Sequence, residues 1–275
     1  RIVGSVQLDY KLHFFPDLHI QANLGIDNGK GSGNDKIDSI MATDYKTAGR
    51  YTYYKQRKQN TLTELSLFYS KDIKSIKSKI DVLALHGYQD FLTNAYNYAS
   101  YGQNGVVIAT SVPPFATDKP QYRLESYLGR INYSYNNKYF LTASIRRDAR
   151  SKFSPDTRVG YFPAVSVAWK LKDDFFKNTN VVSDLKLRAS WGIPGQQDIS
   201  GTGGSFNPLY PYLPVYAYSN SAAQYQFGTT YFNYLRPGAY DPNIKWETTT
   251  TTNLGLDFAF LNNRISGSLD VYNKK

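Results

Sequence analysis

Residues 184–191 read DLKLRASW, and this short run determines the class of fold. Leu185, Leu187 and Trp191 stand at odd positions, and the charged Lys186 and Arg188 stand between them. Because successive side chains of a β-strand point to opposite faces, this alternation predicts a strand with one apolar and one polar face. In a membrane, the apolar residues of this run would face lipid, and Lys186 and Arg188 would face the interior of a barrel.

The same period of two recurs along the whole chain. It is found in 2–12, 18–26, 61–70, 77–88, 122–135, 139–146, 161–171, 254–260 and 265–271. These runs make about ten strands of the length that a tilted membrane crossing requires, so we expect an all-β, antiparallel fold. No stretch approaches the roughly 18 consecutive apolar residues of a membrane-spanning helix, which excludes a helical membrane protein.

Composition narrows the class further. The 275 residues include 25 Tyr, 15 Phe and 3 Trp, a content of aromatic residues that excludes a disordered or collagen-like chain. The chain has no cysteine, so disulfides and thiolate metal sites are also excluded. The formal net charge of +10 favours contact with an anionic partner.

The connections between the expected strands alternate in length. Short ones are expected at 14–17, 71–76, 136–138 and 261–264, and long ones at 27–60, 89–121 and 193–245, where the polar, glycine-rich start of 27–60 is expected to be a flexible loop. Alternate connections of an up-and-down sheet emerge on the same side. The pattern therefore predicts part of a transmembrane β-barrel with short periplasmic turns and long extracellular loops.

Aromatic residues gather where the expected strands end. Tyr133, Tyr135 and Tyr139 flank the Asn-Asn turn, and Phe258 and Phe260 precede the last turn. Such rings are typical of the interfacial girdle of a membrane barrel. A two-layer sandwich with a tyrosine-rich surface is the alternative that the pattern leaves open.

Two blocks resemble a known family. Residues 126–199 contain GR-x-NYSY-x-x-KY, R-x-D-x-x-S-x-F, GYFP-x-VS-x-AW and SDLKLRASWG, and a second block joins Trp246-Glu247 to TNLGLD and NNRISG. These strings are similar to the barrel of the SusC/RagA-type, TonB-linked outer-membrane transporters of the Bacteroidetes. The resemblance implies that residues 1–275 are a fragment holding about ten strands of a 22-stranded barrel, without the plug domain and the TonB box.

The resemblance also implies a function. Transporters of this kind sit in the cell outer membrane and import an oligomeric nutrient, more often a glycan than a peptide, with energy delivered through TonB. It implies a SusD-like surface lipoprotein over the extracellular loops, and the positive charge suits contact with lipopolysaccharide. The alternatives from other classes are a passive porin or adhesin barrel and a secreted glycan-binding β-sandwich.

No catalytic, cofactor or metal site is predicted. The Arg146–Asp148 pair is expected to hold a loop base, and His13, His19 and His86 lack the spacing of metal ligands. The basic residues are scattered and follow no nucleic-acid-binding motif. An enzyme is therefore not expected.

The candidate contact residues are tyrosines of the two long loops. Their rings could stack on sugar faces while their hydroxyls donate hydrogen bonds, and the alternative is that they pack on one another to order the loops. The set is Tyr96, Tyr98, Tyr101, Tyr210, Tyr212, Tyr216, Tyr218 and Tyr231.

Overall fold

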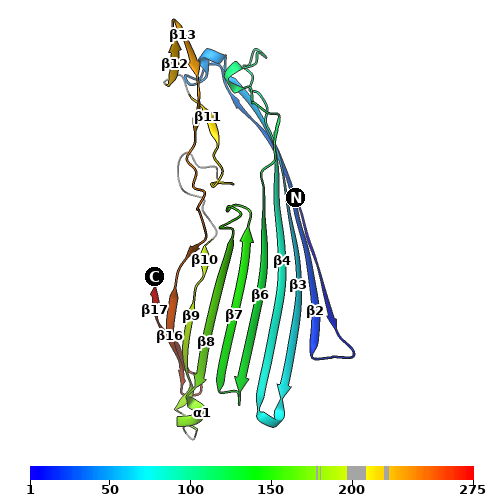
Figure 1. The fold of residues 1–275 in the computed structure, drawn as a ribbon, viewed down its shortest axis with the longest axis vertical. Helices are drawn as coiled ribbons and strands as arrows, with labels where there is room; N and C mark the ends of the chain where they lie inside the picture. Colours follow the sequence, from blue (N-terminus) through cyan, green and yellow to red (C-terminus); the bar gives the residue numbers. More distant parts are fainter. Residues whose placement is uncertain (178, 180, 197–208, 220–222) are drawn as a thin grey trace. The chain divides into compact units, whose positions relative to one another are not determined.

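A computed structural model describes residues 1–177, 179, 181–196, 209–219 and 223–275. Within these residues, ten strands follow one another in a single antiparallel sheet, in the order of the chain (Figure 1). They are β1 (Ile2–Lys11), β2 (Leu18–Ile37), β3 (Arg50–Ile73), β4 (Ser78–Tyr96), β6 (Gln121–Tyr135), β7 (Tyr139–Arg150), β8 (Val159–Lys170), β9 (Val182–Gly192), β16 (Thr251–Phe260) and β17 (Ile265–Lys274).

The remaining elements are short. β5 (Thr117–Asp118) pairs with β4, and three two-stranded sheets follow β9. These sheets join β10 (Gly195–Gln196) to β15 (Glu247–Thr248), β11 (Tyr216–Tyr218) to β14 (Leu235–Pro237), and β12 (Gln224–Phe227) to β13 (Thr230–Asn233). In the part of the chain that the structure describes, helical structure is limited to α1 (Lys172–Phe175) and the 3-10 turns Tyr45–Thr47, Lys74–Ile76 and Ala109–Ser111. None of the helices in the described residues is long and apolar enough to span a membrane.

The all-β, antiparallel prediction is confirmed, and the sandwich alternative is wrong. All ten main strands lie in one sheet rather than in two packed layers. Within the described residues, β1 and β17 each have one neighbouring strand, and both are exposed along their whole length. The sheet is therefore open, with an unpaired edge at each of these two strands.

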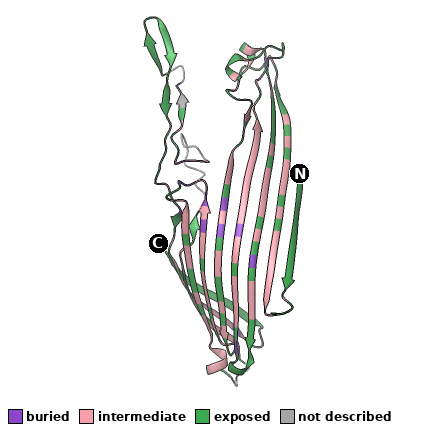
Figure 2. Cartoon of the chain, turned by 45° about the vertical axis from the view of Figure 1, so that its right-hand side comes forward, coloured by how far each residue is buried: buried purple, intermediate pink, exposed green. Residues whose placement is uncertain are grey.

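Strand register divides the sheet from β6 to β17 into two faces. On one face, Tyr139 is opposite Trp169, and Trp169 is opposite Leu187. We call this the apolar face, and the face that carries Lys186 and Arg188 the polar face. Figure 2 shows exposed and partly buried positions interspersed along β6 to β9 and β16, whereas β17 is exposed throughout. The separation of Leu187 from Lys186 and Arg188 that the sequence predicts is confirmed.

Tight turns join the strands at one end of this region. Asn136 and Asn137 have φ of 53° and 55°, and the Lys138 N–H donates to the carbonyl of Tyr135 at 3.0 Å. Asparagine tolerates this left-handed backbone better than most residues, which explains why three residues suffice to join β6 to β7. The turn at Leu261, Asn262 and Asn263 uses positive φ values in the same way.

The expected loop at 27–60 is wrong. Most of it belongs to β2 and β3, and the hairpin loop itself covers only residues 38–49. The Arg1 guanidinium donates to both carboxylate oxygens of Asp27 at 2.9 and 2.7 Å, which ties β1 to β2. Gly33 leaves room for the ring of Tyr54, whose atoms would lie within 2.7 Å of any β-carbon there. Glycine is therefore a packing residue in this strand rather than a sign of flexibility.

Candidate functional site

The tyrosines predicted to contact a ligand fall in two separate groups, and the first group is packed on β3. Tyr96 is the last residue of β4 rather than a loop residue, and the ammonium of Lys55 lies 5.0 Å from its ring centre. The Tyr98 ring meets Tyr53 edge to face at 4.9 Å. Tyr101 exchanges backbone hydrogen bonds of 2.7 and 2.9 Å with Tyr51. These contacts give all three residues a role in ordering the loop after β4.

The second group lies between β9 and β16. Tyr210 and Tyr212 are half-buried, and their rings meet edge to face at 6.3 Å. In contrast, Tyr216 on β11 is 65% exposed and Tyr231 on β13 is 57% exposed. Tyr218 is part of β11, but its side chain lies outside the described residues. Within this group, Tyr216 and Tyr231 offer accessible rings, whereas Tyr210 and Tyr212 pack on each other.

The β12–β13 hairpin adds aromatic residues that are absent from the predicted set. Tyr225 is the cross-strand partner of Phe232, and its ring centre lies 5.1 Å from that of Phe227. All three side chains are more than half exposed, as is Tyr231 beside them. A cluster of solvent-exposed rings on a two-stranded hairpin provides flat apolar faces for a ligand or a partner protein.

A buried cluster lies at the foot of these loops, on the polar face. Phe153 is fully buried, and its ring centre lies 5.3 Å from that of Trp246. Leu124, Phe162 and Ile244 complete the cluster. The Trp246 indole N–H donates to the carbonyl of Arg158 at 2.8 Å, so its one polar group is satisfied. The cluster joins the loop after β7 to the segment that enters β16.

Small residues make room for this cluster. A β-carbon on Gly160 would lie 3.1 Å from Trp246, and one on Gly195 would overlap the ring of Phe162. The Thr157 hydroxyl donates to the carbonyl of Ile244 at 2.7 Å and adds a polar contact between the same two segments. These contacts fix where the tyrosine-bearing region leaves the sheet.

Ion pairs organise the polar face. The Arg146 Nε donates to both oxygens of Asp148 at 2.9 and 2.7 Å, which is the structural role predicted for this pair. Arg188 donates to Asp257 at 2.9 and 2.8 Å and to Asp270 at 3.3 Å, so one guanidinium joins three strands. Its cross-strand partner on β16 is Gly255, whose missing side chain leaves space for the guanidinium. The sequence predicted the face of Arg188 but not its carboxylate partners.

At the opposite end of the strands, the carboxylate of Asp174 in α1 collects three donors. Lys138 donates at 2.6 Å, the Trp169 indole N–H at 2.9 Å and the Tyr139 hydroxyl at 3.2 Å. The hydrogen bond from Lys138, with that from Trp169, lowers the pKa of the Asp174 carboxyl to about 2. The same contact raises the pKa of the Lys138 ammonium. Asp174 thus accepts hydrogen bonds from the polar groups of both Tyr139 and Trp169.

Aromatic residues form a continuous row beside Asp174. Tyr135 stacks with Tyr139 at 6.2 Å, Tyr139 stacks with Trp169 at 5.9 Å, and Trp169 contacts Phe175 at 5.7 Å between ring centres. We call Tyr135, Tyr139 and Trp169 the inner girdle. It contains Tyr135 and Tyr139, two of the rings that flank the Asn-Asn turn, and its place at the tight turns suits a membrane interface. Among the described residues, no group of three or more His, Asp or Glu side chains could hold a metal ion.

Comparisons with known proteins agree with this architecture. The family model described as "TonB dependent receptor-like, beta-barrel" matches residues 3–275. The chain is 39% identical over 284 residues to the TonB-dependent receptor SusC of Bacteroides thetaiotaomicron, a match that covers 99% of this chain and 26% of SusC. It is 30% identical over 278 residues to the TonB-dependent receptor P39 of Formosa agariphila, covering 98% of this chain and 24% of the relative. The chain thus spans about a quarter of the length of these relatives.

A solved structure shows the same fold. A chain of the RagAB peptide transporter superposes with a TM-score of 0.76 at 20% identity, covering 94% of this chain and 28% of that one. The match covers the same open antiparallel sheet that is described above. The chain belongs to the TonB-dependent receptor β-barrel family, and within that family it is of the SusC/RagA type.

Proposed function

We propose that this chain is the middle-to-late barrel portion of a TonB-dependent transporter that imports an oligomeric nutrient across the cell outer membrane. The observation that carries the proposal is the 39% identity to SusC over 99% of the chain. The apolar face of the sheet would meet lipid, and the polar face would line the interior. The plug domain and the segment that engages TonB would belong to the part of the transporter that this chain does not contain.

A glycan is the substrate class that we favour over a peptide. SusC is the more similar relative, whereas the RagAB peptide transporter shares only 20% identity and supports the fold alone. Exposed tyrosines suit glycan capture because their rings cover the apolar faces of sugars and their hydroxyls donate hydrogen bonds. Tyr216 and Tyr231 are the accessible members of the predicted set. The other exposed rings of the β12–β13 hairpin, Tyr225, Phe227 and Phe232, would contact a SusD-like surface lipoprotein.

The first experiment separates active import from a passive pore. Uptake of a labelled oligosaccharide should stop in cells that lack TonB, while the amount of assembled barrel in the outer membrane stays the same. Uptake that continues without TonB would favour the porin alternative and would refute the proposal.

The second experiment tests the tyrosines. If each exposed ring contributes about 1 kcal/mol of stacking, Tyr216→Ala and Tyr231→Ala should each lower the apparent affinity for the substrate about fivefold. The matched control is Tyr212→Ala, which removes a ring packed on Tyr210 and should leave affinity unchanged in correctly assembled protein. Equal losses in all three variants would assign the tyrosines to loop packing.

A further inference from the structure

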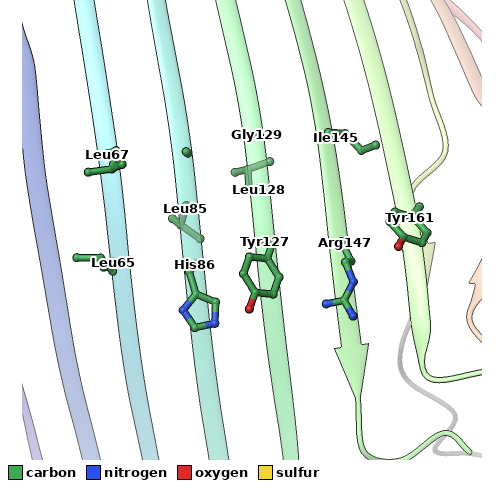
Figure 3. A pocket seen from close by; sticks show the side chains of 11 residues that line it. Leu65, Leu67, Leu85, His86, Tyr127, Leu128, Gly129, Ile145, Arg147 and Tyr161 are labelled. Carbon is green, nitrogen blue, oxygen red and sulfur yellow. The ribbon is translucent and has the colours of Figure 1, made fainter. Parts of the chain in front are cut away.

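A hollow of about 460 Å³ opens on the same face as the inner girdle, several residues farther along the strands. Its floor is aliphatic and comes from four neighbouring strands (Figure 3). Leu65 and Leu67 belong to β3, Ala84 to β4, Gly129 to β6 and Ile145 to β7. Gly129 keeps the centre of the hollow open, since a β-carbon there would meet nothing closer than Ile145 at 3.9 Å.

A row of polar and aromatic side chains borders this hollow. His86, Tyr127, Arg147 and Tyr161 lie side by side on β4, β6, β7 and β8 (Figure 3). Register makes Arg147 the cross-strand partner of Tyr127 on one side and of Tyr161 on the other. The His86 and Tyr127 rings stack at 4.6 Å, and the Arg147 guanidinium lies 5.5 Å from the Tyr127 ring centre. We call these four residues the outer row.

The charged groups at the outer row are the Arg147 guanidinium and the carboxylate of Glu125 beside Tyr127 and His86. Glu125 accepts a hydrogen bond of 2.9 Å from the Tyr127 hydroxyl and lies 3.3 Å from the Nε2 of His86. No carboxylate of the described residues pairs with Arg147, whose charge contact is the Tyr127 ring. Arg146 provides the contrast, because it points to the polar face and is paired with Asp148 at 2.7 Å. An unpaired guanidinium beside an apolar hollow favours an anionic group on a lipid-like ligand.

The depth of the outer row identifies the kind of ligand. Arg147 lies eight residues from Tyr139, and Tyr161 lies eight residues from Trp169, both in the inner girdle. Eight residues span about 26 Å along a strand, and at the strand tilt of about 35–45° that membrane barrels have, this corresponds to a rise of about 18–22 Å, somewhat less than their apolar band of about 25 Å. We therefore place the outer row near the outer edge of this band, where the long Arg147 side chain reaches the headgroups of the outer leaflet, and the hollow inside the hydrocarbon.

We infer that the outer row and the hollow form a binding site for a phosphorylated lipid of the outer leaflet, namely the lipid A part of lipopolysaccharide. The phosphate accepts hydrogen bonds from the Arg147 guanidinium and the Tyr161 hydroxyl, and an acyl chain fills the hollow beside Gly129 and Ile145. The site requires that the barrel sits in an outer membrane, but it is independent of which nutrient is imported.

The test uses the complete transporter, purified in mild detergent and titrated with lipid A while bound lipid is counted by native mass spectrometry. Arg147→Ala should weaken lipid A binding at least tenfold, because it removes the charge that pairs with phosphate. Gly129→Leu should weaken it comparably by filling the hollow. Arg130→Ala, which removes an exposed guanidinium from the polar face, is the matched control and should bind like the wild type.

Two further ligands identify what the site recognises. Dephosphorylated lipid A should bind no better to the wild type than to Arg147→Ala, and inorganic phosphate alone should not compete with lipid A. Competition by phosphate alone would point to an anion site without a lipid, and would overturn the inference. Unchanged lipid A binding in both Arg147→Ala and Gly129→Leu would overturn it as well. Arg147→Lys should retain part of the affinity, and nutrient uptake should persist in every variant, so this result is separate from the proposed function.

Discussion

The register of the sheet predicts how strongly a charge on the apolar face destabilises the barrel at each depth. Val165 lies four residues from Tyr161 and four from Trp169, opposite Ala143 and Trp191. Four residues span about 13 Å along the strand, so Val165 lies near the middle of the apolar band. Val165→Arg should cost about 2–4 kcal/mol, because neither headgroup region is within reach of the new guanidinium.

Leu187 provides the comparison at a different depth. If Leu187 lay near the midplane of the membrane, Leu187→Arg would also lower the free energy of unfolding by about 2–4 kcal/mol, and the strand pattern alone leads to this expectation. Leu187 is instead the cross-strand partner of Trp169 in the inner girdle. An arginine at this interfacial depth should cost only about 0–1 kcal/mol. The two substitutions should therefore differ by roughly a factor of three or more in their effect on the free energy of unfolding.

The assay is reversible unfolding of the complete transporter in lipid vesicles, followed by tryptophan fluorescence against denaturant concentration. Ser166→Arg is the control on the neighbouring position, because Ser166 lies on the polar face opposite Thr142 and Ser190. It should change the free energy of unfolding much less than Val165→Arg. Equal costs for Val165→Arg and Leu187→Arg would refute the assigned depths, and an equal cost for Ser166→Arg would refute the assigned faces.

Three further results are expected. Phe153→Ala should lower the free energy of unfolding by about 3–5 kcal/mol, since the ring is fully buried against Trp246, and Tyr161→Ala is an exposed aromatic comparison. The pKa of Asp174 is lowered to about 2, so its stabilising contribution should be complete above about pH 4 and lost between pH 4 and 2; the stability difference between Asp174→Asn and the wild type should shrink over that interval. The isolated chain should aggregate without detergent because β1 and β17 leave open edges, and a sharp monomeric peak in size-exclusion chromatography would contradict this.

The membrane-crossing part of the fold could be predicted from the sequence because lipid acts on one face only. Residues such as Leu141 and Val167 must be apolar, while Thr142 and Ser166 on the other face need not be. This difference imposes the period of two that identifies the strands. The short turn at Asn136 and Asn137 could be predicted for a local reason, since few residues adopt positive φ so readily.

Residues 27–37 of β2 and 50–60 of β3 could not be predicted as strands in the same way. Both faces of these segments carry polar residues such as Asp27, Asn28 and Arg57, so no alternation marks them as strands. Their pairing depends on contacts between distant residues, as in the hydrogen bond of 3.3 Å from Arg57 to Asn28. A glycine-rich, polar sequence is therefore predicted to be a loop even where its backbone is hydrogen-bonded to neighbouring strands of a sheet.

The candidate site was partly predictable for a similar reason. Composition identified a tyrosine-rich region, but whether a ring is free depends on its neighbours in space. Tyr98 is packed against Tyr53, whereas Tyr216 is exposed, and nothing in the flanking sequence distinguishes the two. Likewise, Phe153 and Trp246 were recognised as parts of motifs, but their contact joins segments that are far apart in the chain.

The structure also shows which positive charges of the chain are paired with carboxylates and which are not. The net charge of +10 predicts an anionic partner without saying where it binds. On the polar face, Arg146 and Arg188 form ion pairs with carboxylates of the sheet, so their charges are balanced within the protein. Arg147 lies on the apolar face without such a pair and contacts the Tyr127 ring instead. This difference is why we propose Arg147, rather than Arg146 or Arg188, as the residue that meets the phosphate of an outer-leaflet lipid.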